Sequence, residues 1–433
     1  MPIKQELIFR KITSIGLGKV IAVLTALVFV VFLGVSAVTT LPVTKVELGQ
    51  DVADGEYIKM GDFNLSPRAT LVGLQGSFSG EGGYVVLIDG DGEIVWRSPE
   101  TWAYFDVSPL ADGRVLSAFL SRDDAECDPT PAPCTGFRIY EVGEDVIQRE
   151  WTYSVRTHAN SEVHDVEILP NGNITVVGME YERVFEVDPD GDIVWQWNAS
   201  EHYDAPQDPT MEDWLHMNDV DRIGEGRYLV SVRNENQLII LDRDEGVVEV
   251  INEDGDPEVL NKQHNPQWLG DGRVLVADSG NDRVVELRKQ NGTWIVNWEL
   301  TSAGGIPFHW PRDADLLENG NILVTDSLNH RVVEVTPGGD AVWSVSPGAV
   351  PYEADRLPQG EYPDGLNGQD FTQDPDELTP KIAQIHIPLI TMVFSAIKGT
   401  LMLPYWVNQW HFMGFILTLI IAAAGIAYDR RRR

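Results

Sequence analysis

Cysteine is nearly absent from this sequence, because only Cys127 and Cys134 occur among its 433 residues. Both lie in the loop "ECDPTPAPCTG". An even pair at close spacing in an exported domain predicts a disulfide. A free pair and a metal site are the alternatives, and the lack of any further thiol disfavours the metal site.

Basic residues are scarce as well. The chain has 32 Lys and Arg against 67 Asp and Glu, and its formal net charge is -35. Nucleic acid is excluded as a partner, because its phosphates would be repelled. The acidic residues are dispersed through turns such as "DGDGE" and "DRDEG", unlike the blocks of disordered acidic tails. We expect a folded domain with an acidic surface, typical of a haloarchaeal protein, because such surfaces remain hydrated in high salt. An ordinary acidic exported protein is the alternative.

Long apolar runs are missing from the middle of the chain and occur only near its ends. Residues 19–38 are apolar over about the 20 residues that span a bilayer, and four basic residues lie before or at the start of this run. We expect an uncleaved anchor, with a signal peptide as the alternative. A second apolar run is followed by Arg430 to Arg433, which the positive-inside rule places in the cytoplasm. Both termini are then cytoplasmic, and the middle faces the outside of a cell membrane.

These features give six predicted segments. A third apolar stretch before the last run contains His386, Pro388 and Lys398, so we expect an interfacial helix there, with a further span as the alternative. The segments are a cytoplasmic N-terminus and anchor at 1–40, a linker at 41–68, a repeat domain at 69–346, an extracellular tether at 347–381, the interfacial helix at 382–406, and a transmembrane helix with its Arg tail at 407–433.

An internal repeat organises the middle of the chain. The stretches "LADGRVLSAF", "LPNGNITVVG", "IGEGRYLVSV", "LGDGRVLVAD" and "LENGNILVTD" each read as strand, tight turn and strand. Each is followed by a third strand, such as "DRVVELR" or "HRVVEVT", and in most copies a fourth strand ends near a tryptophan. Antiparallel units of roughly fifty residues with four strands predict the blades of a β-propeller. We therefore expect an all-β protein with six blades and a transmembrane helix at each end.

The innermost strand of each blade predicts the site. Counting back seven residues from the turn places His164, Asn218, His264 and Arg312 at equivalent positions, with His216 and His309 close by. Equivalent positions of different blades converge on the propeller axis, so these residues should ring one mouth of the channel. The loop "SVRNENQ" brings Arg233 back to the same mouth. Convergent polar groups in a concavity indicate a functional site, and hydrogen-bonded linings of a wet channel are the alternative.

Acidic residues follow three of these positions in the sequence. They are Asp165, Asp219 and Asp313. Their carboxylates can either orient the histidines or bond to the backbone of the blades, and the sequence leaves both interpretations open.

Four stretches of this chain carry a resemblance to a known family. "VHDVEILPNGN", "WLHMND", "SVRNEN" and "KQHNPQWL" are similar to motifs of the arylsulfate sulfotransferase family, and the similarity extends roughly over residues 163–345. The resemblance implies an exported six-bladed propeller that needs no PAPS, no other cofactor and no metal. It implies transfer of a sulfuryl group from a phenolic sulfate donor to a phenolic acceptor through a sulfohistidine. The extra N-terminal β-domain of the family is not evident here, so the acceptor side is expected to differ.

The same resemblance implies roles for individual residues. His264 is the nucleophile, and His164, His216, Asn218 and Arg233 surround the sulfate. His309 and Arg312 are added by the blade register alone. The roles agree with the chemistry, because sulfuryl transfer spreads negative charge over oxygens that need fixed donors and cations, and neutral imidazole is a competent nucleophile.

Two other functions remain open from the sequence. "NDRVVEL" and "NHRVVEV" resemble repeats of the NHL type, whose propellers are binding modules. Four histidines around an axis could alternatively hold a metal ion in an enzyme, although Arg233 then has no evident purpose. The sequence does not define an oligomeric state.

Overall fold

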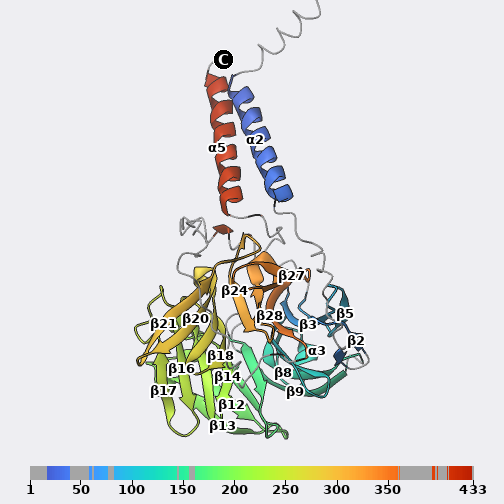
Figure 1. Ribbon diagram of the computed structural model, residues 1–433, viewed down its shortest axis with the longest axis vertical. Helices are drawn as coiled ribbons and strands as arrows, with labels where there is room; N and C mark the ends of the chain where they lie inside the picture. The colour runs from blue at the N-terminus through green and yellow to red at the C-terminus, as the bar shows by residue number, and fades with distance from the viewer. Residues whose placement is uncertain are drawn as a thin grey trace, which may run out of the picture. The chain divides into compact units, whose positions relative to one another are not determined.

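The computed structural model describes residues 17–39, 58–60, 63–76, 82–143, 146–155, 161–358, 360, 393–394, 397, 407 and 409–431. The chain forms two compact units, which are described separately (Figure 1). One comprises residues 1–44 and 381–433, and the other comprises residues 45–380.

The two long helices described in the smaller unit are α2 (Leu17–Thr39) and α5 (Gln409–Arg431). They pack together through Phe29 and Phe415, whose ring centroids lie 6.2 Å apart. Within the described residues, one helical stretch is long and apolar enough to cross a membrane, His411–Arg430 of α5. The apolar stretch Lys19–Val31 of α2 is shorter, so the N-terminal span stays a prediction. The predicted interfacial helix at 382–406 lies outside the described residues except at 393–394 and 397.

The larger unit is an all-β, propeller-like arrangement that contains four separate four-stranded antiparallel sheets (Figure 1). The first sheet comprises β10 to β13, at Val163–Ile168, Ile174–Gly178, Arg183–Val187 and Ile193–Asn198. The second comprises β14 to β17, at Met217–Gly224, Arg227–Val232, Gln237–Asp242 and Gly246–Ile251. The third comprises β18 to β21, at His264–Gly270, Arg273–Asp278, Arg283–Gln290 and Thr293–Leu300. The fourth comprises β24 to β27, at Pro311–Leu316, Ile322–Asp326, Arg331–Val335 and Ala341–Val345.

The remaining long strands form one eight-stranded sheet, where the sequence predicted two separate blades. A single residue pair, Gln75 with Ala103, joins its two halves. The first half contains β3 (Thr70–Gln75), β4 (Val85–Ile88), β5 (Ile94–Arg97) and, paired with β3, β28 (Val350–Arg356). The second contains β6 (Ala103–Pro109), β7 (Arg114–Ser121), β8 (Cys134–Glu141) and β9 (Val146–Ser154). The structure thus separates four blades where six were predicted.

Short elements complete the larger unit. Strands β1 and β2 form a hairpin at Ile58–Met60 and Phe63–Leu65, and β22 and β23 form another at Ser302–Ala303 and Ile306–Pro307. The helix α3 spans Asp124–Cys127. Single turns of 3₁₀ helix, η1 to η5, lie at Ala199–Glu201, Pro209–Met211, Arg233–Glu235, Ser279–Asn281 and Ser327–Asn329.

Strand β28 corrects the predicted end of the repeat domain. It lies within 347–381, which was predicted to be a tether, and it pairs with β3 from Val350↔Gln75 to Arg356↔Thr70. All seven of its residues are buried. The prediction missed this strand because its acidic residues, Glu353 and Asp355, resemble the polar linker that follows. Beside β6 their side chains are enclosed by protein instead of solvent.

Apolar side chains from neighbouring sheets form a shared core. Leu275 and Ala277 of β19 belong to the same buried cluster as Val324 of β25 and Val333 of β26. Each buried Val or Leu contributes about 1.5–3 kcal/mol relative to exposure, so the contact between sheets holds the larger unit together. Polar bonds add to it, since Asp165 accepts from the Val220 N–H at 2.7 Å.

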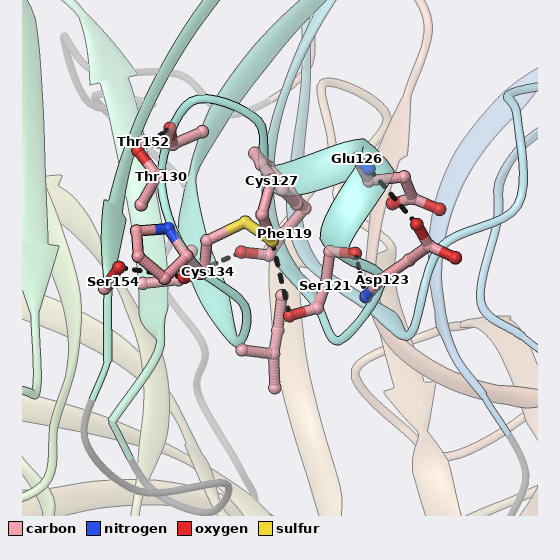
Figure 2. Close-up of a disulfide and its surroundings, with 12 residues drawn as sticks. Phe119, Ser121, Asp123, Glu126, Cys127, Thr130, Cys134, Thr152 and Ser154 are labelled. Carbon is pink, nitrogen blue, oxygen red and sulfur yellow. Dashed lines mark hydrogen bonds between the residues drawn. A yellow bond between two sulfur atoms is a disulfide. The ribbon is translucent and has the colours of Figure 1, made fainter.

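The predicted disulfide is present between Cys127 and Cys134, with an S–S distance of 2.03 Å (Figure 2). It connects the end of α3 to the start of β8. Asp123 caps α3, because its carboxylate accepts from the Ala125 and Glu126 N–H groups. Both cysteines are buried, so the bond fixes the β7–β8 connection against the sheet.

Candidate functional site

A β-bulge occurs near the start of every innermost strand. The ladder between each such strand and its neighbour shifts register there, in β6, β10, β14, β18, β24 and β28. A bulged residue leaves the ladder and its side chain is re-aimed. The skipped residues include His164, Asn218, Arg312 and Tyr352. The sequence register therefore identified His164, Asn218 and Arg312 as positions that the fold treats alike. It was one residue off in β18, where the skipped residue is Asn265 and His264 remains paired with Ala277.

His264 is the first residue of β18 and is held by Ser279 of η4. Its Nδ1 lies 2.7 Å from the Ser279 Oγ. That hydroxyl also lies 2.5 Å from the Pro311 carbonyl oxygen, to which it can only donate. The single hydroxyl proton is thus used, so Oγ accepts the hydrogen of Nδ1–H. The Nε2 of a neutral His264 then carries the free lone pair.

His216 is held in an unfavourable backbone conformation by a buried carboxylate. Its backbone φ angle of 56° lies in the left-handed region, which residues other than glycine rarely adopt. The Glu182 carboxylate accepts from three consecutive N–H groups, those of Leu215, His216 and Met217, at 3.2, 2.6 and 3.0 Å. The His216 Nδ1 lies 2.7 Å from an oxygen of Asp213, which fixes the ring. Glu182 and Asp213 were not predicted from the sequence.

His164 lies between two aromatic rings and a second histidine. Its Nδ1 is 2.8 Å from the Tyr352 hydroxyl, and its ring centroid lies 4.7 Å from that of Phe105 and 5.4 Å from that of His216. Its Nε2 is buried without a hydrogen-bond partner in the described part of the chain, with a Glu162 oxygen 3.6 Å away. The phenol of Tyr352 therefore fixes this ring from one side.

Two arginines complete the group. The Arg233 guanidinium lies 6.0 Å from the centroid of the Trp310 ring, and the Arg312 guanidinium lies 4.7 Å from that of Tyr352. Arg312 donates to the Gln75 side chain at 3.2 Å. Within the described residues, the buried Nε–H of each arginine has no hydrogen-bond acceptor. Both cations thus retain donors for a further ligand. We call His164, His216, His264, Arg233 and Arg312 the histidine–arginine cluster.

Burial and mutual repulsion keep the histidines of the cluster neutral. Burial lowers the pKa of His264 well below its usual value, and the charges of Arg233, Arg312 and the other two histidines lower it further. The pKa of His164 is lowered well below its usual value for the same reasons. Burial also lowers the pKa of His216, but the Asp213 carboxylate opposes that effect. These mutual effects show that the five side chains share one electrostatic environment.

Two predicted residues differ from the rest. Asn218 lies fully buried, and its Nδ2 donates to the Gln263 carbonyl at 3.0 Å, so it positions the backbone next to His264. The His309 Nδ1 lies 3.7 Å from an Asp282 oxygen, and the backbone N–H of His309 donates to the Asp326 carboxylate. The ring and the backbone N–H of His309 thus lie beside carboxylates of Asp282 and Asp326.

The carboxylates that follow the bulges bond to backbone and hydroxyl groups. Asp165 accepts from the Val166 and Val220 N–H groups, and Asp313 accepts from the Ala354 N–H and the Thr325 hydroxyl. The interpretation in which these residues bond to the blades is therefore correct for both. They do not orient the histidines through these bonds.

The fold and the cluster together define a propeller-like protein whose buried nitrogen donors suit a small oxyanion. Residues 58–269 match the model of the arylsulfotransferase (ASST) family, and this match supports placing the chain in that family. The matched range starts at β1 and includes His164, His216, Asn218, Arg233 and His264. It ends before His309, Arg312 and Tyr352. The match begins earlier and ends earlier than the resemblance drawn from the sequence motifs.

Solved structures give weaker likenesses. A protein of unknown function from Bacteroides caccae has a TM-score of 0.49 and 19% identity, over 67% of this chain and 98% of that one. A protein from Lactobacillus plantarum has a TM-score of 0.44 and 12% identity, over 67% and 99%. A catalytically inactive virginiamycin B lyase from Staphylococcus aureus with quinupristin has a TM-score of 0.40 and 12% identity, over 66% and 85%. No curated protein matches the sequence.

Proposed function

We propose that this chain is a PAPS-independent aryl sulfotransferase that moves a sulfuryl group from a phenolic sulfate ester to a phenolic acceptor. The observation that carries the proposal is the histidine–arginine cluster. In a chain with a net charge of -35, two arginines with unused donors adjoin three neutral histidines. An anion with several oxygens would use those donors and balance the two charges.

The first step uses the lone pair of the His264 Nε2. It attacks the sulfur of the aryl sulfate, the N–S bond forms, and the S–O bond to the phenol breaks. Ser279 keeps the proton on Nδ1. Arg233 and Arg312 stabilise the charge that spreads over the sulfuryl oxygens in the transition state.

The second step reverses the first with another phenol. The acceptor oxygen attacks sulfur, the N–S bond breaks, and its electron pair returns to Nε2. The departing phenolate of the first step needs a proton, and the acceptor phenol must lose one. We assign the proton exchange to His216, whose neutral ring takes the proton of the acceptor phenol and gives it to the next departing phenolate. The Asp213 carboxylate at 2.7 Å stabilises the protonated ring in between, although burial keeps the pKa of His216 below its usual value. His164 has weaker support for a positive charge, since its described polar neighbours are the Tyr352 phenol and a Glu162 carboxylate 3.6 Å away.

The proposed setting is the outer face of a cell membrane. α5 and α2, which contains the apolar run 19–38, are proposed as transmembrane helices, with both termini cytoplasmic, the propeller outside and the bilayer as a partner. We count the eight-stranded sheet as two blades, which gives six. This count is supported by the innermost strands β6, β10, β14, β18, β24 and β28, which contact one another in that order, with β28 returning to β6.

The geometry favours this function over a histidine-bound metal. Among the described residues, no three histidines bring their nitrogens together at the spacing of metal ligands. Each of the three cluster histidines uses its Nδ1 for a hydrogen bond to Ser279, Asp213 or Tyr352. A binding module of the NHL type is tested by the same experiment as the enzyme.

The test uses the full chain in detergent with 4-nitrophenyl sulfate, with and without an added phenol. We expect nitrophenol release that depends on phenol, and His264→Ala should lower it by at least about a thousandfold. The control is His202→Ala, because His202 is exposed and its ring meets the Tyr203 ring edge-to-face. No release by a folded wild-type chain, or equal release by the His264 variant, contradicts the proposal.

A further inference from the structure

We propose that a divalent cation, Ca²⁺, binds between Asp106 of β6, Asp165 of β10 and Glu353 of β28. One carboxylate oxygen from each residue lies within 4.8 Å of the other two. Two oxygens that bind the same Ca²⁺ lie no more than about 4.6–5.2 Å apart, so this spacing is compatible with one shared ion. No thiol or imidazole is part of the group, which favours a hard cation that prefers oxygen ligands.

Unpartnered oxygens give an independent reason to expect an ion there. The Oδ2 atom of Asp106 is buried without a hydrogen-bond partner in the described part of the chain, and the residue is 2% exposed. Both carboxylate oxygens of Asp355, which is 1% exposed, also lack a partner there. Buried polar groups are nearly always paired, and an ion is one of the few partners that a lone carboxylate accepts.

The surrounding charge also requires compensation. Asp165 and Asp355 lie close enough to Asp106 for their negative charges to act on it, and Asp106 is almost completely buried. Asp219, which is also buried, lies close enough to Asp165 and Asp106 for their charges to act on it. Several carboxylates thus share one enclosed space. Either they hold protons or a cation neutralises them, and these two states respond differently to added calcium.

The proposed site adjoins the histidine–arginine cluster in sequence. Asp106, Asp165 and Glu353 directly follow Phe105, His164 and Tyr352, whose rings pack together at 4.7–5.2 Å. The ion would join three innermost strands, β6, β10 and β28, that come from distant parts of the chain. The site does not depend on sulfuryl transfer, and its test uses no sulfate ester.

The experiment measures the thermal unfolding of the full chain in detergent after metal removal with EDTA. The buffer contains about 1 M KCl, which screens attraction to the acidic surface beyond ~3 Å. We expect millimolar Ca²⁺ to raise the melting temperature by several degrees and to bind at one ion per chain by metal analysis, since a ligand that binds only the native state stabilises it. Asp106→Asn and Glu353→Gln should abolish both effects. Asp91→Asn, at an exposed hairpin position, should leave them unchanged.

Each other outcome overturns the proposal. An unchanged melting temperature in Ca²⁺ means that the carboxylates hold protons, and in that state the Asn and Gln variants should be more stable than wild type. An equal shift in the wild type and both variants places the ion elsewhere. A shift with Mg²⁺ but not with Ca²⁺ overturns the choice of ion. If one of the two variants fails to fold, the other and the stoichiometry of the wild type decide the result.

Discussion

The Tyr352 hydroxyl lies 2.8 Å from Nδ1 of His164, although 188 residues separate them in the chain. Tyr352 is supplied by β28, the last of the described strands, and His164 by β10. Tyr352 also lies under the Arg312 guanidinium and 6.0 Å from the His264 ring. One phenol from the end of the propeller thus contacts members of the cluster on three other strands.

Tyr352→Phe should weaken the cluster without removing a reacting group. The Nδ1 of His164 loses its partner, which costs about 1–3 kcal/mol of stability for a buried polar atom. We expect kcat/KM to fall about tenfold and the acid limb of the pH profile to move. Steady-state kinetics from pH 5 to 9 measure both. Tyr181→Phe is the control because Tyr181 is 44% exposed, and an unchanged profile in Tyr352→Phe would argue against a positioning role.

Ser279→Ala should allow the His264 ring to change its tautomer. Without Oγ, the Nδ1–H loses its acceptor and the proton can move to Nε2, which removes the nucleophilic lone pair. We expect the rate of sulfohistidine formation to fall about 10–100-fold while KM changes little. A stopped-flow burst of nitrophenol measures that rate. Ser279→Thr keeps the hydroxyl and should restore much of it, whereas equal loss in both variants would indicate a packing effect.

Arg233→Lys should weaken binding of the anion while keeping the charge. Lysine cannot reproduce the planar fork of donors that a guanidinium offers to oxyanions. We expect KM for the aryl sulfate, and the inhibition constant for free sulfate, to rise about 10–100-fold. Arg227→Lys serves as control, since Arg227 pairs with Asp242 on an exposed edge. Unchanged sulfate inhibition in Arg233→Lys would separate this residue from the anion.

Stability without divalent ions should fall as pH rises. Burial raises the pKa of Asp165 and of Asp313 from 3.8 to about 7. Between pH 3.8 and about pH 7, the folded chain holds protons on these two carboxyl groups that the unfolded chain has released. The stability that the two protonated groups contribute is therefore complete below pH 3.8 and is lost by about pH 7. The lowered pKa values of His164 and His264 act in the opposite sense below pH 6.5.

The carboxylates outnumber these histidines, because the pKa values of Asp106, Asp219, Asp315 and Asp355 are raised as well. We therefore expect the melting temperature in EDTA to fall by several degrees from pH 5 to pH 7.5. Asp313→Asn should flatten that slope. A melting temperature that rises over this range would show that the histidines dominate.

The sequence revealed the parts of this molecule that depend on local patterns. The copies of the repeat can be aligned in the sequence, and this alignment predicts the strands and the hairpin turns. It also predicts the equivalent positions of His164, Asn218 and Arg312. Tyr352 and Glu182 could not be found in this way. Tyr352 acts across 188 residues, and Glu182 bonds to backbone amides that carry no sequence signal. The number of separate sheets also differed, because one pair, Gln75 with Ala103, joins two predicted blades.

The position of β28 also sets the order of assembly. Among the described strands, the one that supplies Tyr352 comes last in the chain, and it pairs with β3, which is one of the first. A chain that stops at Val345 contains His164, His216, His264 and both arginines, yet its first and last blades cannot join. Under the proposed function, a chain that ends before β28 lacks both Tyr352 and the strand that pairs with β3, so we expect such a truncated product to be inactive.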